Sequence, residues 1–163
     1  STPTDSALAE LQEDIKVILS RIEKPEKVVV TGGMPYANGP LHLGHLAGAF
    51  IPSDIYARFN RMFIGAENVL FVSGNDDHGS TSELSAKKAG LEVREFIGGI
   101  HNKHKSTMAA YNVSLDTFSG TSREELFEFH KDYCQNFLRS LYKNGMLNTK
   151  SSEQWFDTSA GIF

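Results

Sequence analysis

The chain has 163 residues, of which 40% are hydrophobic and 22% are charged, and its formal net charge is −4. This length suffices for one domain with a hydrophobic core, or for one domain and part of another. The acidic balance disfavours a surface that coats nucleic acid, because such surfaces are distinctly basic. The single cysteine, Cys134, rules out a disulfide within the chain and favours a reducing compartment. We expect Cys134 to be a small apolar core residue.

The N-terminal region is polar and acidic. It has neither the apolar run of a membrane-spanning segment nor the basic flank of a signal peptide, so we expect a cytoplasmic protein with no membrane partner. An apolar stripe predicts a first helix between Asp5 and Pro25 that packs on its own domain, the alternative being an arm that binds a partner. The stripe consists of Leu8, Leu11, Ile15, Ile18, Leu19 and Ile22.

Residues 27–30 form a β-branched run, which predicts a central strand buried on both faces of a parallel sheet. A glycine-rich loop, residues 31–45, then leads into a helix over residues 43–63. The first N–H groups of a helix lack partners, so such a strand-to-helix turn is suited to phosphate. His42 and His45 share one face of the first turn and can stabilise charge on a phosphate. The alternative is a solvated turn with no ligand.

Pro52 interrupts the apolar pattern of this helix, and we expect a kink or a new start at Ser53. Residues 68–73 predict a second buried strand, with residues 74–79 as the loop at its carboxyl end. Strand, helix and strand in this order form a right-handed βαβ unit. The two loops should therefore lie at neighbouring carboxyl ends of the sheet, where open α/β sheets bind ligands.

The second loop carries two adjacent carboxylates. Asp76 suits the ammonium group of an amino acid, because a carboxylate accepts charge-assisted hydrogen bonds from it. The alternative is that Asp76 and Asp77 are ordinary loop residues that bind their own backbone. Spacing alone favours this alternative for both residues, and for Asp77 we retain it.

The next apolar patterns predict helices over residues 80–89 and 93–111. His101 and His104 lie three residues apart on the second helix, a spacing that metal ligands use. No third ligand is in view, so we expect a solvated helix face and no metal site in this chain.

The C-terminal part begins with a predicted short strand at residues 114–119. Ser122 and Glu125 have the spacing of a capping box, which predicts a helix from Ser122 to Gly145. Beyond it, Trp155 and its aromatic neighbour favour a small β element.

Two motifs resemble those of a known family. Pro-Tyr-Ala-Asn-Gly at residues 35–39 with His-Leu-Gly-His at residues 42–45 resembles the "HIGH" signature of class I aminoacyl-tRNA synthetases, in the form found in the methionine and isoleucine enzymes. Gly-Asn-Asp-Asp-His-Gly at residues 74–79 resembles a segment of the methionine enzymes, in which an Asp lies three residues before the Gly of a His-Gly pair. In combination the motifs make the chain similar to methionyl-tRNA synthetases from about Val28 to Phe163.

The resemblance implies an α/β fold with a Rossmann-type parallel sheet and flanking helices, the first half of a class I catalytic domain, preceded by an N-terminal helix. Residues 1–26 would be a helical extension and residues 27–120 the first half of the catalytic domain. Residues 121–163 would be a helix and the truncated start of the inserted connective segment. The family's zinc knuckle in that insert, its "KMSKS" lysine loop and its anticodon-binding domain do not occur in this sequence. We expect the isolated chain to have little or no activity.

The resemblance also implies the reaction. The methionine carboxylate attacks the α-phosphate of ATP, supplied with Mg²⁺, and methionyl-adenylate then transfers its methionyl group to tRNA(Met), which binds through regions that this sequence does not contain. His42 and His45 would be catalytic and stabilise the phosphates, Gly44 would accommodate the adenine, and Asp76 would hold the substrate ammonium. The other implied site residues are Pro35, Asn38 and Gly39 for ATP, and Gly33, Met34 and Tyr36 for methionine.

Two other functions compete with this interpretation. A small nucleotidyltransferase of the adenylyltransferase kind also uses His-x-Gly-His, but it lacks the preceding Pro-Tyr-Ala-Asn-Gly and carries a second, serine-rich motif that is not found here. A non-catalytic, synthetase-like binding module would not need His42, His45 and Asp76, and their presence disfavours it.

Overall fold

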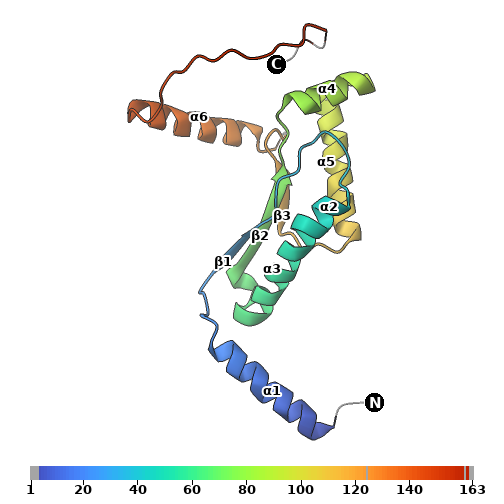
Figure 1. Cartoon of the computed structure of the whole chain (residues 1–163), viewed down its shortest axis with the longest axis vertical. Coiled ribbons are helices and arrows are strands. Elements are labelled where there is room, and N and C mark those ends of the chain that lie inside the picture. The colour runs from blue at the N-terminus through green and yellow to red at the C-terminus, as the bar shows by residue number, and fades with distance from the viewer. Residues whose placement is uncertain (1–3, 124, 160, 162–163) are drawn as a thin grey trace.

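A parallel sheet of three strands forms the centre of the molecule, in the order β1-β2-β3 (Figure 1). The structure, a computed structural model, describes residues 4–123, 125–159 and 161. The strands are β1 (Val28–Thr31), β2 (Val69–Asn75) and β3 (Thr117–Gly120), and β1 and β3 both run parallel to β2. The predicted α/β class is confirmed, and β1 and β2 are neighbours as the βαβ pattern requires.

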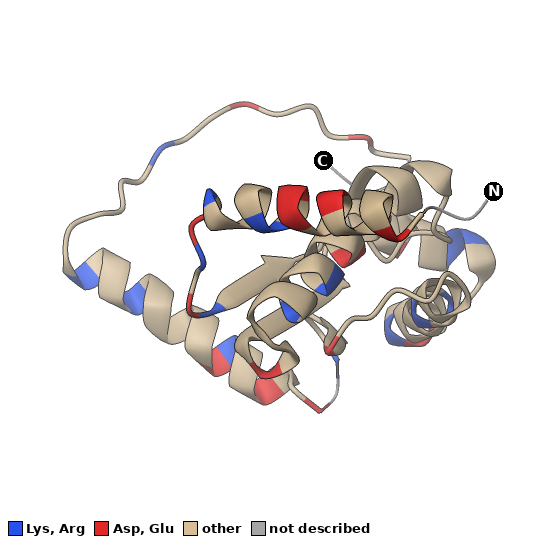
Figure 2. Cartoon of the chain, turned by 90° about the horizontal axis from the view of Figure 1, so that it is seen from below, with Lys and Arg blue, Asp and Glu red and all other residues tan. Residues whose placement is uncertain are grey.

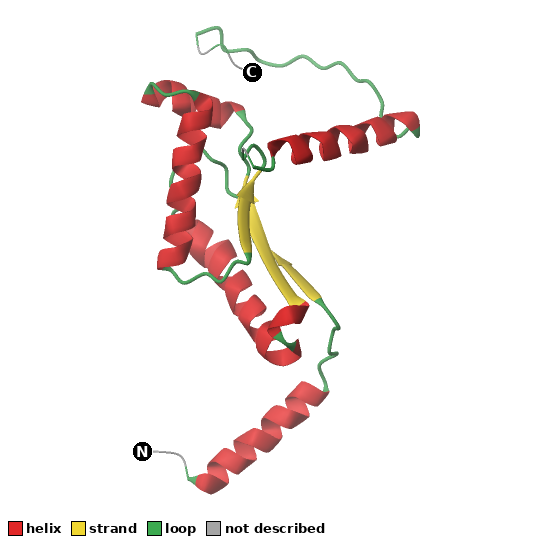
Figure 3. Cartoon of the chain, turned by 180° about the vertical axis from the view of Figure 1, so that it is seen from behind, coloured by secondary structure: helices red, strands yellow, loops and turns green. Residues whose placement is uncertain are grey.

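Helices cover one face of this sheet. The segment between β1 and β2 contains α2 (Leu43–His45), the π-helical turn η1 (Leu46–Phe50), α3 (Ile51–Ile64) and the 3-10 turn η2 (Ala66–Asn68). The segment between β2 and β3 contains α4 (Ser80–Ala89) and α5 (Val93–Ala110). Figures 1 and 3 show α3 and α5 on the same side of the strands. The carboxyl ends of β1 and β2 and the loops that follow them therefore lie close to α5.

The core lies between this face and α3. Val30 and Phe71 pack against Ala57 in the larger cluster of buried apolar residues. Val29 and Leu70 point to the other face and are 65% and 48% exposed. The predicted burial of both strands on two faces is therefore wrong. Strand β1 lies at an edge of the sheet, and nothing in the described part of the chain covers the second face.

The expected interruption near Pro52 occurs one turn earlier than predicted. The π-helical turn ends at Phe50, and α3 then runs from Ile51 without a break at Ser53. Pro52 lies in the first turn of α3, directly after the π-helical turn, and has no N–H to donate to that turn. The π-helical turn η1 before Pro52 therefore leads directly into α3, and the two form one continuous helical segment.

The terminal helices project away from the sheet (Figures 1 and 3). Neither α1 (Asp5–Ser20) nor α6 (Phe127–Lys143) contains a buried residue. The prediction that the first helix packs on its own domain is therefore wrong, and so is the prediction that Cys134, on α6, is a core residue, because it is exposed. An apolar stripe identifies the face that can be buried but not what covers it.

The segments around α6 also differ from the sequence prediction. The strand expected at residues 114–119 is present as β3, shifted to Thr117–Gly120. Helix α6 begins at Phe127 without a side-chain cap, so Ser122 does not cap it. Among residues 146–159 the structure describes no strand, and the predicted β element is reduced to a single bridge residue, Asp157.

Candidate functional site

The loops that follow β1 and β2 are hydrogen-bonded to each other beyond the end of the sheet. The Ala37 N–H donates to the Asp76 carbonyl over 3.1 Å, and the Asp76 N–H donates to the Pro35 carbonyl over 3.0 Å. These two bonds form an isolated parallel bridge between Tyr36 and Asp76. The prediction that the two motif loops lie together is confirmed, and their relative position is fixed by backbone bonds.

His42 and His45 open the helix that follows the first loop. Their rings stack with centroids 3.8 Å apart and an interplanar angle of 29°. The Gly44 N–H donates to His42 Nδ1 over 3.1 Å, and the His42 N–H donates to His45 Nδ1 over 3.2 Å. Both Nδ1 atoms therefore act as acceptors, so each neutral ring carries its proton on Nε2. The predicted sharing of one helix face is confirmed, and each ring keeps an Nε2–H donor.

Gly44 makes this arrangement possible. A Cβ atom at this position would lie 3.0 Å from the Cε1 and Nδ1 atoms of His42. A side chain would push the His42 ring off the N–H groups that it caps. Gly44 thus has a demonstrable role in placing His42, separate from the adenine contact that the motif implies.

The two carboxylates of the second loop have different surroundings. Asp76 is partly exposed, and its Oδ1 accepts a bond of 3.4 Å from the His78 N–H. Asp77 is 2% exposed, and its Oδ2 accepts bonds from the N–H and hydroxyl of Ser122 over 2.9 and 3.1 Å. Asp77 therefore anchors the segment after β3, far along the chain, and the prediction that it binds its own loop backbone is wrong. Asp76 retains an accessible carboxylate.

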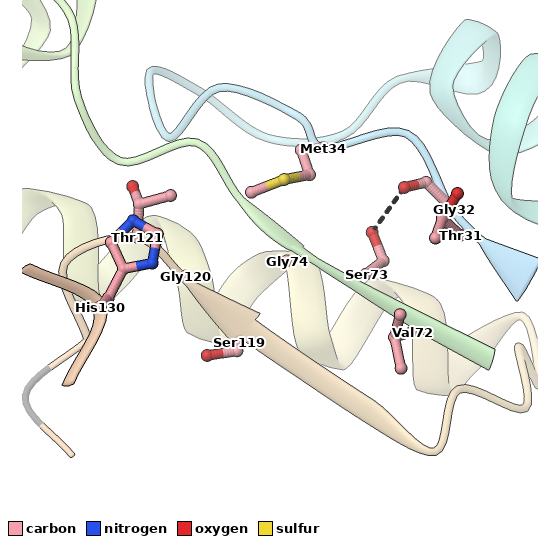
Figure 4. Close-up of a pocket in the computed structure, with 10 residues that line it drawn as sticks. All are labelled: Thr31, Gly32, Met34, Val72, Ser73, Gly74, Ser119, Gly120, Thr121 and His130. Atoms are coloured by element: carbon pink, nitrogen blue, oxygen red, sulfur yellow. Dashed lines mark hydrogen bonds between the residues drawn. The ribbon is translucent and has the colours of Figure 1, made fainter. Parts of the chain in front are cut away.

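An open cavity of about 280 Å³ runs along the carboxyl ends of the three strands (Figure 4). Figure 4 shows the Met34 side chain near Gly74 of β2, with Thr121 and His130 together at one end of the cavity. Of the predicted methionine-binding residues only Met34 lines this cavity. Gly33 and Tyr36 are exposed beside it, on the same loop.

A buried polar cluster lies beneath the first loop. Asn75, the last residue of β2, is fully buried and hydrogen-bonds to both His101 and His104 of α5. His104 Nε2 lies 2.7 Å from the Gly39 carbonyl oxygen, and Asn75 Nδ2 donates to the Pro35 carbonyl over 3.3 Å. The expectation that the two histidines form a solvated face is wrong, since they are 6% and 1% exposed.

Three of the histidines are harder to protonate than a free imidazole. Burial is the main cause of the lowered pKa of His104, and it outweighs the Gly39 carbonyl and Asp77, which both favour the cation. Burial also lowers the pKa of His101, with Arg123 as the next cause. The pKa of His45 is lowered by burial and by the neighbouring His42. The rings of His45, His101 and His104 therefore favour the neutral form at pH 7.

The sequence profile described as tRNA synthetases class I (M) matches residues 28–163. The chain is 37% identical over 139 residues to the methionine–tRNA ligase of Chlamydia abortus, and 38% identical over 140 residues to that of Cytophaga hutchinsonii. These alignments cover 85% and 86% of this chain. The chain belongs to the methionyl-tRNA synthetase family. It spans only 24% and 19% of these relatives' lengths.

A solved structure supports the same family. The methionyl-tRNA synthetase of Mycobacterium tuberculosis, in complex with methionyl-adenylate, aligns with a TM-score of 0.59 and 28% identity. The alignment covers 64% of this chain and 20% of that one. The Rossmann-type sheet expected of the family is thus confirmed for the part of the synthetase fold that this chain spans.

The described residues contain neither a cluster of metal ligands nor a membrane-spanning helix. No three His, Cys, Asp or Glu side chains of residues 4–123, 125–159 and 161 are grouped so that they could hold a metal ion. Within the same residues no helix is long and apolar enough to cross a membrane.

The sequence analysis named His101 and His104 but missed their burial and their hydrogen bonds to Asn75. A signal for them was available, because the two histidines fall on the helical stripe of Ile97, Ile100 and Met108, all of which are buried. A polar residue on a buried stripe must find a hydrogen-bond partner. Asn75 is that partner, and it directly precedes Asp76, the residue that the sequence predicts to bind the substrate ammonium.

Proposed function

We propose that this chain supplies the first part of the catalytic domain of a methionine–tRNA ligase, which activates L-methionine with ATP and transfers it to tRNA(Met). The observation that carries the proposal is the Tyr36–Asp76 bridge, which joins a phosphate-suited loop to a loop with an accessible carboxylate. The family assignment and the methionyl-adenylate bound to the M. tuberculosis enzyme support it.

ATP binds at the first loop and the start of α2. The Nε2–H donors of His42 and His45 contact the phosphates and stabilise the charge that develops while the α-phosphate is attacked. One preorganised donor of this kind is worth about 2.7–4 kcal/mol of barrier in other enzymes. The remaining residues of the ATP site are Pro35, Asn38, Gly39 and Gly44.

Methionine binds between the two loops. The Asp76 carboxylate accepts hydrogen bonds from its ammonium group, and the apolar surfaces of Met34 and Tyr36 contact its side chain. Gly33 completes this side of the pocket. The half-exposed state of Met34 and Tyr36 leaves their apolar surface available to a ligand.

The reaction proceeds in two transfers. A carboxylate oxygen of methionine forms a bond to the α-phosphorus of ATP, the bond from that phosphorus to the pyrophosphate oxygen breaks, and pyrophosphate leaves. A hydroxyl at the 3′ end of tRNA then attacks the carbonyl carbon of methionyl-adenylate, and AMP leaves. Mg²⁺ accompanies ATP as part of the substrate and offsets the charge of its phosphates.

Zinc has no place in this chain. Structural zinc sites need several thiolate or imidazole ligands, whereas the chain has one cysteine, Cys134, which is exposed. Any zinc of such an enzyme is held outside these residues, and no step of the proposed reaction involves it.

The tRNA binds to parts of the enzyme outside these residues. Figure 2 shows Lys and Arg scattered among Asp and Glu along the helices, and the net charge is −4. Within this scheme residues 1–26 are an extension, residues 27–120 the first half of the catalytic domain and residues 121–163 the start of the connective insert. The chain acts in the cytoplasm and has little activity by itself.

Calorimetric titration with a non-hydrolysable methionyl-adenylate analogue tests the proposal. We expect saturable binding of the methionyl compound and at least tenfold weaker binding of the isoleucyl analogue. Asp76→Asn should weaken binding by about tenfold or more, since it removes a charge-assisted bond worth about 1.5–3 kcal/mol. Equal affinity for both analogues, or an unchanged affinity in the variant, would contradict the assignment.

A further inference from the structure

Two backbone carbonyls of the first loop accept hydrogen bonds from buried side chains outside the loop. Asn75 Nδ2 donates to the Pro35 oxygen over 3.3 Å, and His104 Nε2 lies 2.7 Å from the Gly39 oxygen. Pro35 and Gly39 bracket the turn that carries Tyr36 and Asn38. That turn is itself exposed at both residues. The bonds from Asn75 and His104 at its two ends therefore act together with the backbone bonds to Asp76 in holding its conformation.

The contacts determine where the protons are. A carbonyl oxygen can only accept, so His104 Nε2 carries a hydrogen and donates it to Gly39. An amide nitrogen can only donate, so the Asn75 Nδ2 group, 2.7 Å away, donates to a bare Nδ1 of His104. The Asn75 Oδ1 atom then accepts from His101 Nδ1 over 2.9 Å. His104 must be neutral for this chain of bonds to exist.

We propose that Asn75 and His104 are positioning residues for the ATP loop: they hold the Pro35 and Gly39 carbonyls, and with them the start of α2, against the end of β2. The inference rests on the ATP-binding role proposed for that loop. Because Asn75 directly precedes Asp76, the side chain of Asn75 holds the first loop from the position next to that of the carboxylate proposed to bind the ammonium group.

Packed side chains surround Asn75 and hold its hydrogen bonds to His101, His104 and the Pro35 carbonyl in place. Ala37, in the middle of the turn, is fully buried and packs with Ile97 and Ile100 of α5. His101 stacks on Phe118 of β3 with ring centroids 5.0 Å apart. The cluster is thus held between β2, β3 and α5, and the loop rests on it.

Several charged groups face the two rings. Asp77, from the second loop, favours the cation of both, whereas Arg123 and Lys105 disfavour the cation of His101. In the first loop His45 is the titratable group that faces His104. Burial outweighs Asp77, so the neutral, acceptor-competent form of His104 prevails at neutral pH.

Two substitutions of His104 separate positioning from simple core filling. His104→Gln retains an amide donor near the Nε2 position and can still bond the Gly39 carbonyl, but it loses the acceptor for Asn75. His104→Asn retains an acceptor near Nδ1 but cannot reach Gly39. We expect His104→Gln to leave the ¹³C shift of the Gly39 carbonyl close to its original value. His104→Asn should shift that resonance and the amide resonances of His42 and His45.

The ¹⁵N shifts of the imidazole in the unsubstituted chain provide a test that needs no variant. We expect a protonated Nε2 and a bare Nδ1 for His104 at pH 7, with the hydrogen of His101 on Nδ1. A doubly protonated His104, or one with its hydrogen on Nδ1, overturns the inference. So do equal effects of the two substitutions on the Gly39 carbonyl.

Binding of the methionyl-adenylate analogue links the network to function. We expect His104→Asn to weaken binding about tenfold, the effect of one lost hydrogen bond, and His104→Gln to weaken it less than threefold. Comparable affinities for the two variants overturn the positioning role. If the original chain shows the expected ¹⁵N and ¹³C signals but binds no analogue, the proposed function fails while the placement of the loop by Asn75 and His104 stands.

Discussion

Two pairs of histidines in this chain share a spacing of three residues and have opposite surroundings. His42 and His45 stand at the start of α2, stacked on each other, with His42 exposed. His101 and His104 lie in the middle of α5, buried, and both hydrogen-bond to Asn75. The Nδ1 atoms of the first pair accept hydrogen bonds at the helix start, whereas the second pair uses donors and acceptors inside the fold.

The difference shows that the role of a histidine pair depends on its neighbours rather than on its spacing. Glycine and proline surround the first pair, which ends a loop, while Ile97, Ile100 and Met108 surround the second on one helix stripe. A buried imidazole must be satisfied by protein groups, and an exposed one can serve a substrate. Substitutions should therefore affect catalysis at the first pair and stability at the second.

The largest expected effect is on adenylate formation. In the chain completed with the rest of its catalytic domain, His42→Asn or His45→Asn should slow ATP–pyrophosphate exchange by about 10²–10³-fold, because each removes one donor to the transferring phosphate. The matched His→Gln variants keep a donor near Nε2 and should lose less. A decrease below about threefold in both Asn variants would contradict the catalytic role.

Replacing the centre of the buried cluster should cost the most stability. Asn75→Ala leaves His101 Nδ1 and His104 Nδ1 without their partner, and each unsatisfied buried group costs about 1–3 kcal/mol. We expect the free energy of unfolding in urea to fall by about 3 kcal/mol. Asn68→Ala, which removes a bond to the Ile64 carbonyl and an exposed bond to Glu67 at a less buried site, is the control and should cost about 1 kcal/mol. Equal decreases in the free energy of unfolding for the two variants would show that the Asn75 hydrogen bonds contribute no more to stability than the bonds of Asn68.

The pH dependence of stability should follow the buried pair. The pKa values of His101 and His104 are lowered in the folded chain, so the unfolded chain binds more protons in mild acid. Stability is therefore fully present above pH 6.5, the ordinary histidine pKa, and is lost as the pH falls through the folded values. Urea titrations at pH 7.5, 6 and 5 should show this decline, with a shallower slope for His104→Gln. A stability that is constant over this range would be inconsistent with buried, neutral rings.

The smallest expected effect is on stability at the exposed pair. His42→Ala removes the acceptor of the Gly44 N–H at the helix start, a capping contact worth about 0.5–1 kcal/mol in an exposed position. Thermal unfolding followed by circular dichroism should shift by only a few degrees. A destabilisation as large as that of Asn75→Ala would remove the contrast between the two pairs.

The sequence predicted the sheet and the meeting of the motif loops because both depend on short-range patterns. Apolar runs mark β1 and β2, and the crossover rule then places their carboxyl ends side by side. These features can therefore be predicted without knowledge of distant contacts.

Features that depend on distant partners could not be predicted in the same way. Asp77 bonds to Ser122, 45 residues away, and His104 bonds to the Gly39 carbonyl, 65 residues away. The terminal helices α1 and α6 show the converse, since their apolar stripes have no cover within the described residues. Local patterns give the chemistry that a face or a side chain can offer, and the tertiary fold selects its partner.

The bridge between Tyr36 and Asp76 also restricts how the lengths of the two loops can change. Thr31 is in register with Val72, and the next pairing joins Tyr36 to Asp76, so five steps along one loop match four along the other. Because the two pairings fix both ends of the first loop, deleting one residue from residues 32–35 would force the remaining residues onto a different backbone path and change the directions of their side chains. Insertions and deletions in either loop should therefore be tolerated only when the other loop changes with it, and chimaeras that exchange one loop without its partner should fail.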